Sequence, residues 1–445
     1  MFLMGLPMIL SMVLQALYNI VDSVFIANMP QHGEAALNAL TLAFPMQMLM
    51  VAVSIGTGVG TNALVAQCLG HGDKEKAGRT AGNAQFLALI IYFVFLIFGV
   101  FGVQAYISSQ TANTLVCEMA TSYLKICCIF SLGISFFAVY EKLLQAAGHP
   151  VYSTIAQIAG AVSNIILDPI LIYGWLGCPA YGVKGAAYAT VIGQCVSWIT
   201  ALAFHLVCNP EIETHLKWFR PSMQIIRQIY AVGLAAIIAQ ALMSVMTYAL
   251  NLILGTVSET MITAYGLYCK IQQFILFAAF GLRDAITPIV SFSYGMGSKS
   301  RINAGVRYGL LYTVCMMLAG MVAVELLALP LVNTFGLSGQ TKGLCISAIR
   351  VISVSFVFAG VNIASQGVFQ ALEGGWQSLM ISICRQILFV LPVAWGCARA
   401  VRQSNAPAWI IWLSFPIAEL ATAAIAFYLL HSIWKSITYK ILQKS

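Results

Sequence analysis

The stretch VAQCLGHGDK at Val65–Lys74 recurs as VSFSYGMGSK at Val290–Lys299, 225 residues further along the chain. In both copies valine, two glycines and a lysine occupy the same positions. The same shift relates two further pairs, Gly56 with Gly281 and Gln145-Ala146 with Gln370-Ala371. Three matches at one shift indicate that the second half of the chain repeats the first.

The composition is that of a membrane protein. Of 445 residues, 60% are hydrophobic and 8% are charged, and the mean hydropathy is +0.88. A soluble domain would carry roughly a quarter charged residues. A helix crosses a bilayer with about 20 mostly apolar residues. We therefore expect an all-α, polytopic membrane protein with about twelve spans, at residues 2–27, 36–66, 80–106, 117–146, 150–174, 182–207, 224–254, 260–290, 303–330, 342–371, 377–398 and 408–433.

The repeat divides these spans into two sets of six with the same orientation. Parallel repeats around an axis along the membrane normal are known among transporters. We predict an N-terminal six-helix lobe at 1–207, a cytoplasmic linker at 208–223, and a C-terminal lobe at 224–445 that ends in a short cytoplasmic tail.

Loop charges predict the orientation. With the N-terminus inside, the inner side holds Lys74, Lys76, Arg79, Lys142, Lys217, Arg220, Arg227, Lys299, Arg301, Arg307, Lys435, Lys440 and Lys444. The outer side holds Lys184, Lys342, Arg399 and Arg402. Cytoplasmic loops are enriched in lysine and arginine, so we place both termini in the cytoplasm. The same rule explains the net charge of +8 without a nucleic-acid partner.

The first span carries a polar stripe of Ser11, Gln15, Tyr18 and Asp22, spaced three or four residues apart and hence on one helix face. Polar contacts between helices suffice to explain Ser11 and Gln15. A carboxylate inside a bilayer is costly and marks a functional site, which singles out Asp22. The seventh span repeats the stripe with an amide in place of the carboxylate, as Gln240, Ser244, Tyr248 and Asn251.

Two later spans supply polar residues at a similar depth. Asn164 and Asp168 lie four residues apart in the fifth span, directly before Pro169. Thr190 follows near the outer start of the sixth span. At about 1.5 Å per residue, these three residues and Asp22 fall in the outer half of the bilayer. We expect them to converge on one site.

Taken together, these segments resemble MATE, the multidrug and toxic compound extrusion family, along nearly the whole chain. The likeness rests on LPMIL and LYNIVDSVFIA in the first span, VAQCLGHGDKEKAGR, QAAGHPVYS, NIILDPILIYG with GVKGAAYAT, and RQILFVLPVAWG. The resemblance implies two lobes with alternating access in the bacterial cytoplasmic membrane. It implies export of bulky, often cationic drugs or dyes in exchange for H+ or Na+, by a monomer that needs no cofactor.

The resemblance also implies site residues. The cation-coupling residues of the family match Tyr18, Asp22, Asn164, Asp168 and Thr190, which would be the only ligands of a metal ion, Na+. The helix-bending proline matches Pro7. Some members carry an acidic residue where this chain has Gln240, so a second-lobe cation mechanism is not implied. Gln15, Gln240, Tyr248 and Asn251 are candidates for lining a substrate cavity.

Other functions fit the sequence less well. A major-facilitator transporter has a loop signature whose spacing differs from LGHGDKEKAGR, and an ATP-driven pump needs a phosphate-binding loop that this sequence lacks. A lipid-linked oligosaccharide flippase of the same superfamily would need more cationic residues. A membrane-embedded prenyltransferase, the enzymatic alternative, would need clustered acids for Mg2+. The contribution of Glu325 and Glu419 and the choice between H+ and Na+ stay open.

Overall fold

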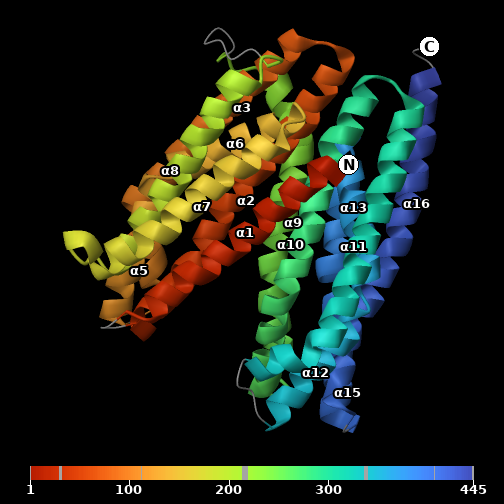
Figure 1. Cartoon of the computed structure of the whole chain (residues 1–445). Coiled ribbons are helices and arrows are strands. Elements are labelled where there is room, and N and C mark those ends of the chain that lie inside the picture. Colours follow the sequence, from red (N-terminus) through yellow and green to blue (C-terminus); the bar gives the residue numbers. More distant parts are fainter. Residues whose placement is uncertain are drawn as a thin grey trace. The chain divides into compact units, whose positions relative to one another are not determined.

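The computed structural model describes residues 2–29, 33–111, 113–212, 219–334, 339–404 and 406–442. Every regular element in these ranges is a helix, as Figure 1 shows, which confirms the predicted all-α class. Within these described ranges, nine helices are long and apolar enough to cross a membrane, and eleven if each of two bent pairs counts as one span. Helix α1 covers the remaining predicted span.

The helices follow the predicted spans closely. Those of the first half are α1 (Phe2–Ala27), α2 (Gly33–His71), α3 (Lys74–Ile97), α4 (Val103–Ser108), α5 (Thr114–Ile129), α6 (Leu132–Ala146), α7 (Pro150–Tyr173) and α8 (Val183–Cys208). Those of the second half are α9 (Met223–Gly255), α10 (Glu259–Gly295), α11 (Lys299–Thr334), α12 (Gly339–Ser353), α13 (Phe356–Ala371), α14 (Gly375–Ile383), α15 (Val390–Ser404) and α16 (Ser414–Leu442).

Two predicted spans are broken helices, which hydropathy alone does not reveal. The span at 117–146 consists of α5 and α6 with a bend of 48°, and that at 342–371 consists of α12 and α13 with a bend of 53°. A serine lies at each break, and its N–H bonds three residues back, from Ser131 to Cys128 O and from Ser355 to Ile352 O. Such a bond tightens the last turn of a helix before it ends, and at the second break the Ser355 hydroxyl also donates to Ile352 O. Both halves break at equivalent positions.

The repeat is also visible where helices end. Gly72, Gly148 and Gly297 have positive φ directly after α2, α6 and α10, and Glu373 has φ 62° at the same point after α13. In each case the residue after the one with positive φ donates its backbone N–H to the carbonyl oxygen five residues earlier. This arrangement is called a Schellman motif. The four motifs form two pairs, each related by the shift of 225 residues. This agreement supports the internal repeat independently of residue identity.

Glu373 adopts a backbone conformation that suits glycine better, and Gly148 is its counterpart. We expect Glu373→Gly to stabilise the protein by about 1 kcal/mol, because the left-handed conformation costs an L-residue roughly that much. The reverse change, Gly148→Glu, should destabilise it by a similar amount. Thermal unfolding of the two purified variants in detergent measures both effects. Equal melting temperatures for wild type and Glu373→Gly would contradict the inference that the backbone at Glu373 is strained.

The chain folds into two compact units. One, called the N-terminal unit here, comprises Leu10–Ile237, and the other, the C-terminal unit, comprises Met1–Ile9 and Ile238–Ser445. The predicted lobes, 1–207 and 224–445, stay a prediction, since these units are defined by packing alone. Residues 213–218 of the predicted linker lie outside the described part.

Small residues bring helices of the N-terminal unit close together. Helix α8 packs on α7 and α6, and α2 packs on α3 and α6 (Figure 1). A side-chain carbon at Gly160 would collide with Ser197 Oγ and with the carbonyl oxygen of Gly193. Close backbone approach through glycine is a common mode of packing in membranes. This contact fixes α7, which carries Asn164 and Asp168, against α8, which carries Thr190.

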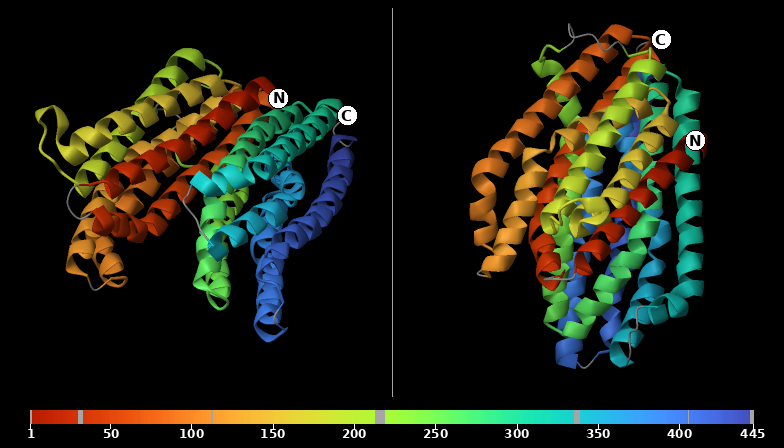
Figure 2. Two further views of the ribbon diagram at one scale, coloured as in Figure 1. Left: turned by 60° about the horizontal axis from the view of Figure 1, so that its bottom comes forward. Right: turned by 60° about the vertical axis from the view of Figure 1, so that its left-hand side comes forward.

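The C-terminal unit has its own core. Helices α10, α11 and α13 pack on one another, and α13 also packs on α16 (Figure 2). Tyr265, Trp412 and Phe415 form a stacked aromatic group inside this unit. Each unit therefore buries its own apolar residues.

Candidate cation site

Helix α7 presents an amide and a carboxylate on one buried face. Asn164 and Asp168 are four residues apart, and Asn164 Nδ2 donates to Asp168 Oδ1 at 3.4 Å. Asp168 is fully buried and Asn164 is nearly so. Pro169 leaves the carbonyl four residues earlier without its usual helical donor. The sequence prediction that these two side chains face the same way is confirmed.

Asp22 of α1 joins them. Its carboxylate interacts electrostatically with Asp168 and with Tyr18. Three buried oxygens of this group accept no hydrogen bond from any described residue: Asp22 Oδ1, Asn164 Oδ1 and Asp168 Oδ2. Buried polar atoms are normally satisfied, so three unsatisfied acceptors in one group call for a cationic or protonated partner.

The donor set suits such a partner. Carboxylate and amide oxygens are the ligands that hard cations prefer, and two neighbouring buried carboxylates favour uptake of a proton by one of them. Both H+ and Na+ therefore fit the residues present.

Two further residues belong to this region and escaped the sequence analysis. Tyr123 of α5 accepts a hydrogen bond from Gln47 Nε2 of α2 at 3.2 Å. It also forms a side-chain hydrogen bond with Thr190 and interacts with Asp22. The sequence does not mark either residue, because Gln47 stands alone in an apolar run and Tyr123 lies among other polar residues, Thr121, Ser122 and Lys125. Only the packing of α2, α5 and α8 brings them together.

A cavity within the N-terminal unit adjoins this group. The space between its walls, including the part open to the surroundings, is about 740 Å³. Tyr18, Asn164 and Thr190 line it, and so does Gln15, a predicted cavity residue. The lining residues are Met12, Gln15, Tyr18, Val51, Ile55, Ile134, Phe137, Ala138, Glu141, Lys142, Gln157, Gly160, Ala161, Asn164, Thr190, Gly193, Gln194 and Ser197.

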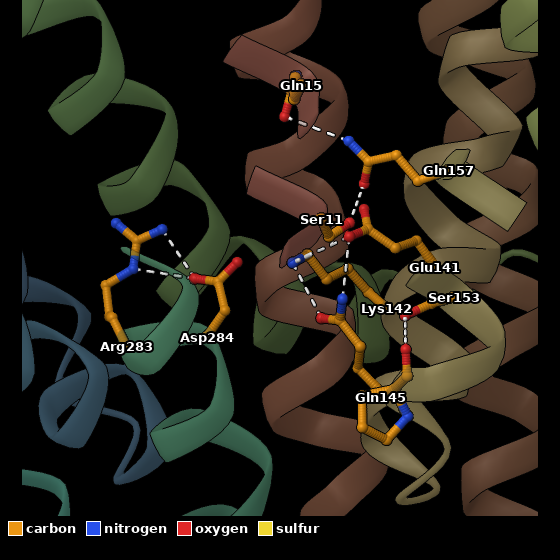
Figure 3. Close-up of polar contacts among 10 residues, drawn as sticks. Ser11, Gln15, Glu141, Lys142, Gln145, Ser153, Gln157, Arg283 and Asp284 are labelled. Atoms are coloured by element: carbon orange, nitrogen blue, oxygen red, sulfur yellow. Dashed lines mark hydrogen bonds and ion pairs between the residues drawn. The ribbon is translucent and has the colours of Figure 1, made fainter. Parts of the chain in front are cut away.

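Gln157 connects the polar face of α1 to α7. Its Oε1 accepts from Ser11 Oγ, and its Nε2 donates to Gln15 Oε1 at 3.5 Å (Figure 3). Gln157 lies seven residues before Asn164 and so on the same helix face. That spacing could have revealed it in the sequence. The stripe on α1 thus serves partly as polar contact between helices, as expected for Ser11 and Gln15.

Comparison with known proteins decides the family. The family model described as MatE matches residues 7–170 and 235–395, once in each half. The chain belongs to the MatE family. It is 24% identical over 433 residues to the multidrug export protein MepA of Staphylococcus saprophyticus, covering 96% of this chain and 92% of that protein. MepA of Staphylococcus haemolyticus is 23% identical over 439 residues, with 98% and 93% covered.

Solved structures agree. A MATE protein in complex with MaL6 has a TM-score of 0.90 and 26% identity, over 98% of this chain and 96% of that one. The outward-facing conformation of a multidrug resistance MATE family transporter of the MOP superfamily has a TM-score of 0.90 and 25% identity, over 98% and 95%. These relatives confirm the two-lobe helical membrane fold and the resemblance found in the sequence.

The structure shows the surroundings of one inner-side cation of this MatE protein. Lys142 lies within α6, inside the predicted span 117–146, and it is only 1% exposed and lines the cavity. The sequence does not reveal this burial, because a lysine four residues before a helix end can equally be exposed there. The excess of positive charge on the inner side does not depend on it.

The second half differs from the first at the corresponding stripe. Gln240 and Tyr248 of α9 are exposed, whereas Asn251 Oδ1 is buried without a donor among the described residues. Their role as cavity residues stays a prediction. Glu419 binds Arg385 Nε at 2.7 Å, and Glu325 accepts from Ser353 Oγ at 2.6 Å. Both acids are thus engaged by side chains of the C-terminal unit.

Proposed function

We propose that this MatE protein is a secondary antiporter of the bacterial cytoplasmic membrane that exports bulky, often cationic drug-like molecules against inward H+ or Na+. The observation that carries this proposal is the group of three unsatisfied acceptor oxygens on Asp22, Asn164 and Asp168, beside a cavity lined by Tyr18, Asn164 and Thr190. The relatives named multidrug export protein MepA support the substrate class. We also propose that the protein functions as a monomer and that both of its termini lie in the cytoplasm.

Coupling follows from the electrostatics of the site. Two carboxylates in a low-dielectric setting repel one another, and a bound cation relieves that repulsion. A ligand shifts a conformational equilibrium only when it binds one form better than the other. Asp22 and Asp168 hold the charge of the cation, Asn164 supplies a neutral oxygen, and Thr190 and Tyr18 complete the site beside the cavity. Alternating access between two lobes then exchanges cation for substrate.

Dye efflux from cells that express the protein tests the proposal. The pH gradient and the Na+ gradient are collapsed separately, each with its own ionophore. We expect efflux to stop when one of the two gradients is removed, and that gradient identifies the coupling ion. Efflux that persists without either gradient would contradict secondary antiport.

Pro7 provides a separate prediction about motion. It lies inside α1, fifteen residues before Asp22, and leaves one backbone carbonyl without its helical donor. If α1 changes between bent and straight forms, Pro7→Ala should favour the straight form by about 1 kcal/mol, the net worth of one hydrogen bond, and slow turnover about fivefold. Substrate affinity should change little. Pro330→Ala in α11 is the control, and equal turnover in Pro7→Ala and wild type would leave Pro7 as a static feature.

A further inference from the structure

One side of helix α11 in the C-terminal unit (Figure 1) is left uncovered by the other described segments along its first turns. Tyr308 is 49% exposed and Tyr312 is 39% exposed, and their rings stack with centroids 6.0 Å apart. The exposed residues lie three or four positions apart and hence on one side of the helix. We call this surface the α11 face, and it consists of Arg301, Ala304, Arg307, Tyr308, Leu311 and Tyr312.

The internal repeat supplies a counterpart in which the same face is buried. Helices α3 and α11 begin at residues that the shift of 225 relates. Tyr308 corresponds to Asn83 and Tyr312 corresponds to Leu87. Asn83 is only 1% exposed and Leu87 only 5% exposed. The two halves therefore differ in what covers this position.

In the N-terminal unit the chain itself covers the face. Asn83 Nδ2 donates to Arg220 O at 3.2 Å, and Asn83 Oδ1 accepts from Ser222 N at 2.7 Å. The ring of Phe86 meets the ring of Phe219 edge-on, with centroids 5.7 Å apart. The segment that leads into α9 is thus anchored on α3 by one amide and one aromatic ring.

The α11 face has lost both anchors, because Tyr308 replaces Asn83 and Leu311 replaces Phe86. It carries uncompensated positive charge instead. No ion pair joins Arg301 or Arg307 to another described residue, and residues 296–324 contain neither aspartate nor glutamate. In α3, by contrast, Arg79 pairs with Glu75 at 2.8 Å. An occupant of the α11 face should therefore be anionic at one end and apolar beyond it.

The place of the face along the helix suits a phospholipid. Helix α11 has 36 residues and is about 54 Å long, whereas the hydrocarbon core is about 30 Å thick. Its first turns can thus reach the headgroup region. Ala304 lies three residues from each arginine, so a small side chain separates two guanidinium groups, which bind phosphate through paired N–H donors. Tyr308 and Tyr312 are typical of the membrane interface, and the exposed Leu318 and Val322 continue the surface with aliphatic side chains.

We propose that the α11 face binds an anionic phospholipid of the cytoplasmic leaflet. The lipid phosphate lies between Arg301 and Arg307, and one acyl chain runs along Tyr308, Leu311 and Tyr312. The lipid takes the place on α11 that residues 219–222 occupy on α3. Anionic lipids of the cytoplasmic leaflet attract lysine and arginine beside a membrane helix, and α11 begins on the side that we predict to be cytoplasmic. This inference goes beyond the proposed export function.

Native mass spectrometry of the purified protein measures the affinity for the headgroup. Phosphatidylglycerol and phosphatidylcholine with identical acyl chains are titrated against wild type and the double variant Arg301→Gln with Arg307→Gln. We expect the double variant to weaken phosphatidylglycerol binding about thirtyfold, from about fivefold for each arginine, and to change phosphatidylcholine binding by less than about twofold. Arg399→Gln with Arg402→Gln in α15 is the matched control, since both arginines are exposed. The control should keep phosphatidylglycerol binding within about twofold of wild type.

Crosslinking in nanodiscs then locates the lipid. A phosphatidylglycerol analogue with a diazirine near the glycerol end of one acyl chain is photoactivated, and adducts are mapped by peptide mass spectrometry. We expect adducts at residues 304–312, few at the equivalent residues 79–87, and loss of the first set in the arginine double variant. Equal labelling by the matching phosphatidylcholine analogue would overturn the proposal. So would an unlabelled α11 face in wild type, which would mean that a protein segment covers it. Neither measurement needs a gradient, so both are independent of whether the protein exports drugs.

Discussion

Asp22→Asn should abolish gradient-driven efflux while the protein remains folded. The change keeps the shape of the side chain and reproduces Asn251, the amide at the corresponding place in α9. Asp22 and Asp168 interact electrostatically. Loss of one of the two carboxylates that would hold a bound cation should cost about 3 kcal/mol, which is a factor of about 100 in cation affinity. We expect dye efflux in cells to fall to the level of cells without the protein.

Matched variants define what this result means. Asp168→Asn should act like Asp22→Asn, because its Oδ2 is also an unsatisfied acceptor. Asn251→Ala should have a much milder effect, because no carboxylate accompanies it in α9. Wild-type efflux by a well-expressed Asp22→Asn protein would disprove the coupling role. If Asn251→Ala caused a larger defect than Asp22→Asn, the cation site would belong to the second half of the chain, and its assignment to the first half would be wrong.

Gly160→Ala should strongly destabilise the N-terminal unit. The new carbon collides with Ser197 Oγ and Gly193 O, and a backbone carbonyl cannot move without shifting α8. Overpacking of this kind costs about 3 kcal/mol. The displaced helices carry Asn164 and Thr190, so dye binding should weaken as well. Melting temperature in detergent and dye affinity in nanodiscs measure the two effects.

Gly266→Ala in α10 is the control for that change. Among the described residues, no heavy atom beyond the neighbouring backbone of α10 lies within 4 Å of the added carbon, and alanine favours a helix over glycine by about 1 kcal/mol. The control should therefore keep or raise the melting temperature. If Gly160→Ala were as stable as Gly266→Ala, the close approach of α7 and α8 would not be the constraint inferred here.

Sequence reasoning identified the features that depend on local pattern. The helices could be predicted from the apolar runs, because each run is long enough to cross a bilayer. The repeat could be predicted from the matches at a shift of 225 residues, and the equivalent helix ends at Gly148 and Glu373 support it. The spacing of Asn164 and Asp168 correctly placed both on one helix face. In each case the information lies within one helix or in a comparison of two copies.

Features that depend on packing between distant segments were missed. Tyr123 and Gln47 meet Thr190 because α2, α5 and α8 pack together, and neither residue has a sequence neighbour that reveals this. The burial of Lys142 was also missed, because its place near the inner end of the predicted span 117–146 does not show whether the side chain is exposed. The breaks at Ser131 and Ser355 lie inside continuous apolar runs and leave the hydropathy unchanged.

Cation movement driven by substrate tests the central claim most directly. Purified protein is placed in liposomes with no pH or Na+ gradient, a substrate gradient is imposed, and internal pH and internal Na+ are recorded with trapped indicators. We predict that wild-type protein moves one of the two cations in the direction opposite to the substrate, and that Asp22→Asn moves neither. Substrate flux through the wild-type protein without movement of either cation, or equal cation flux in Asp22→Asn, would contradict antiport through this site.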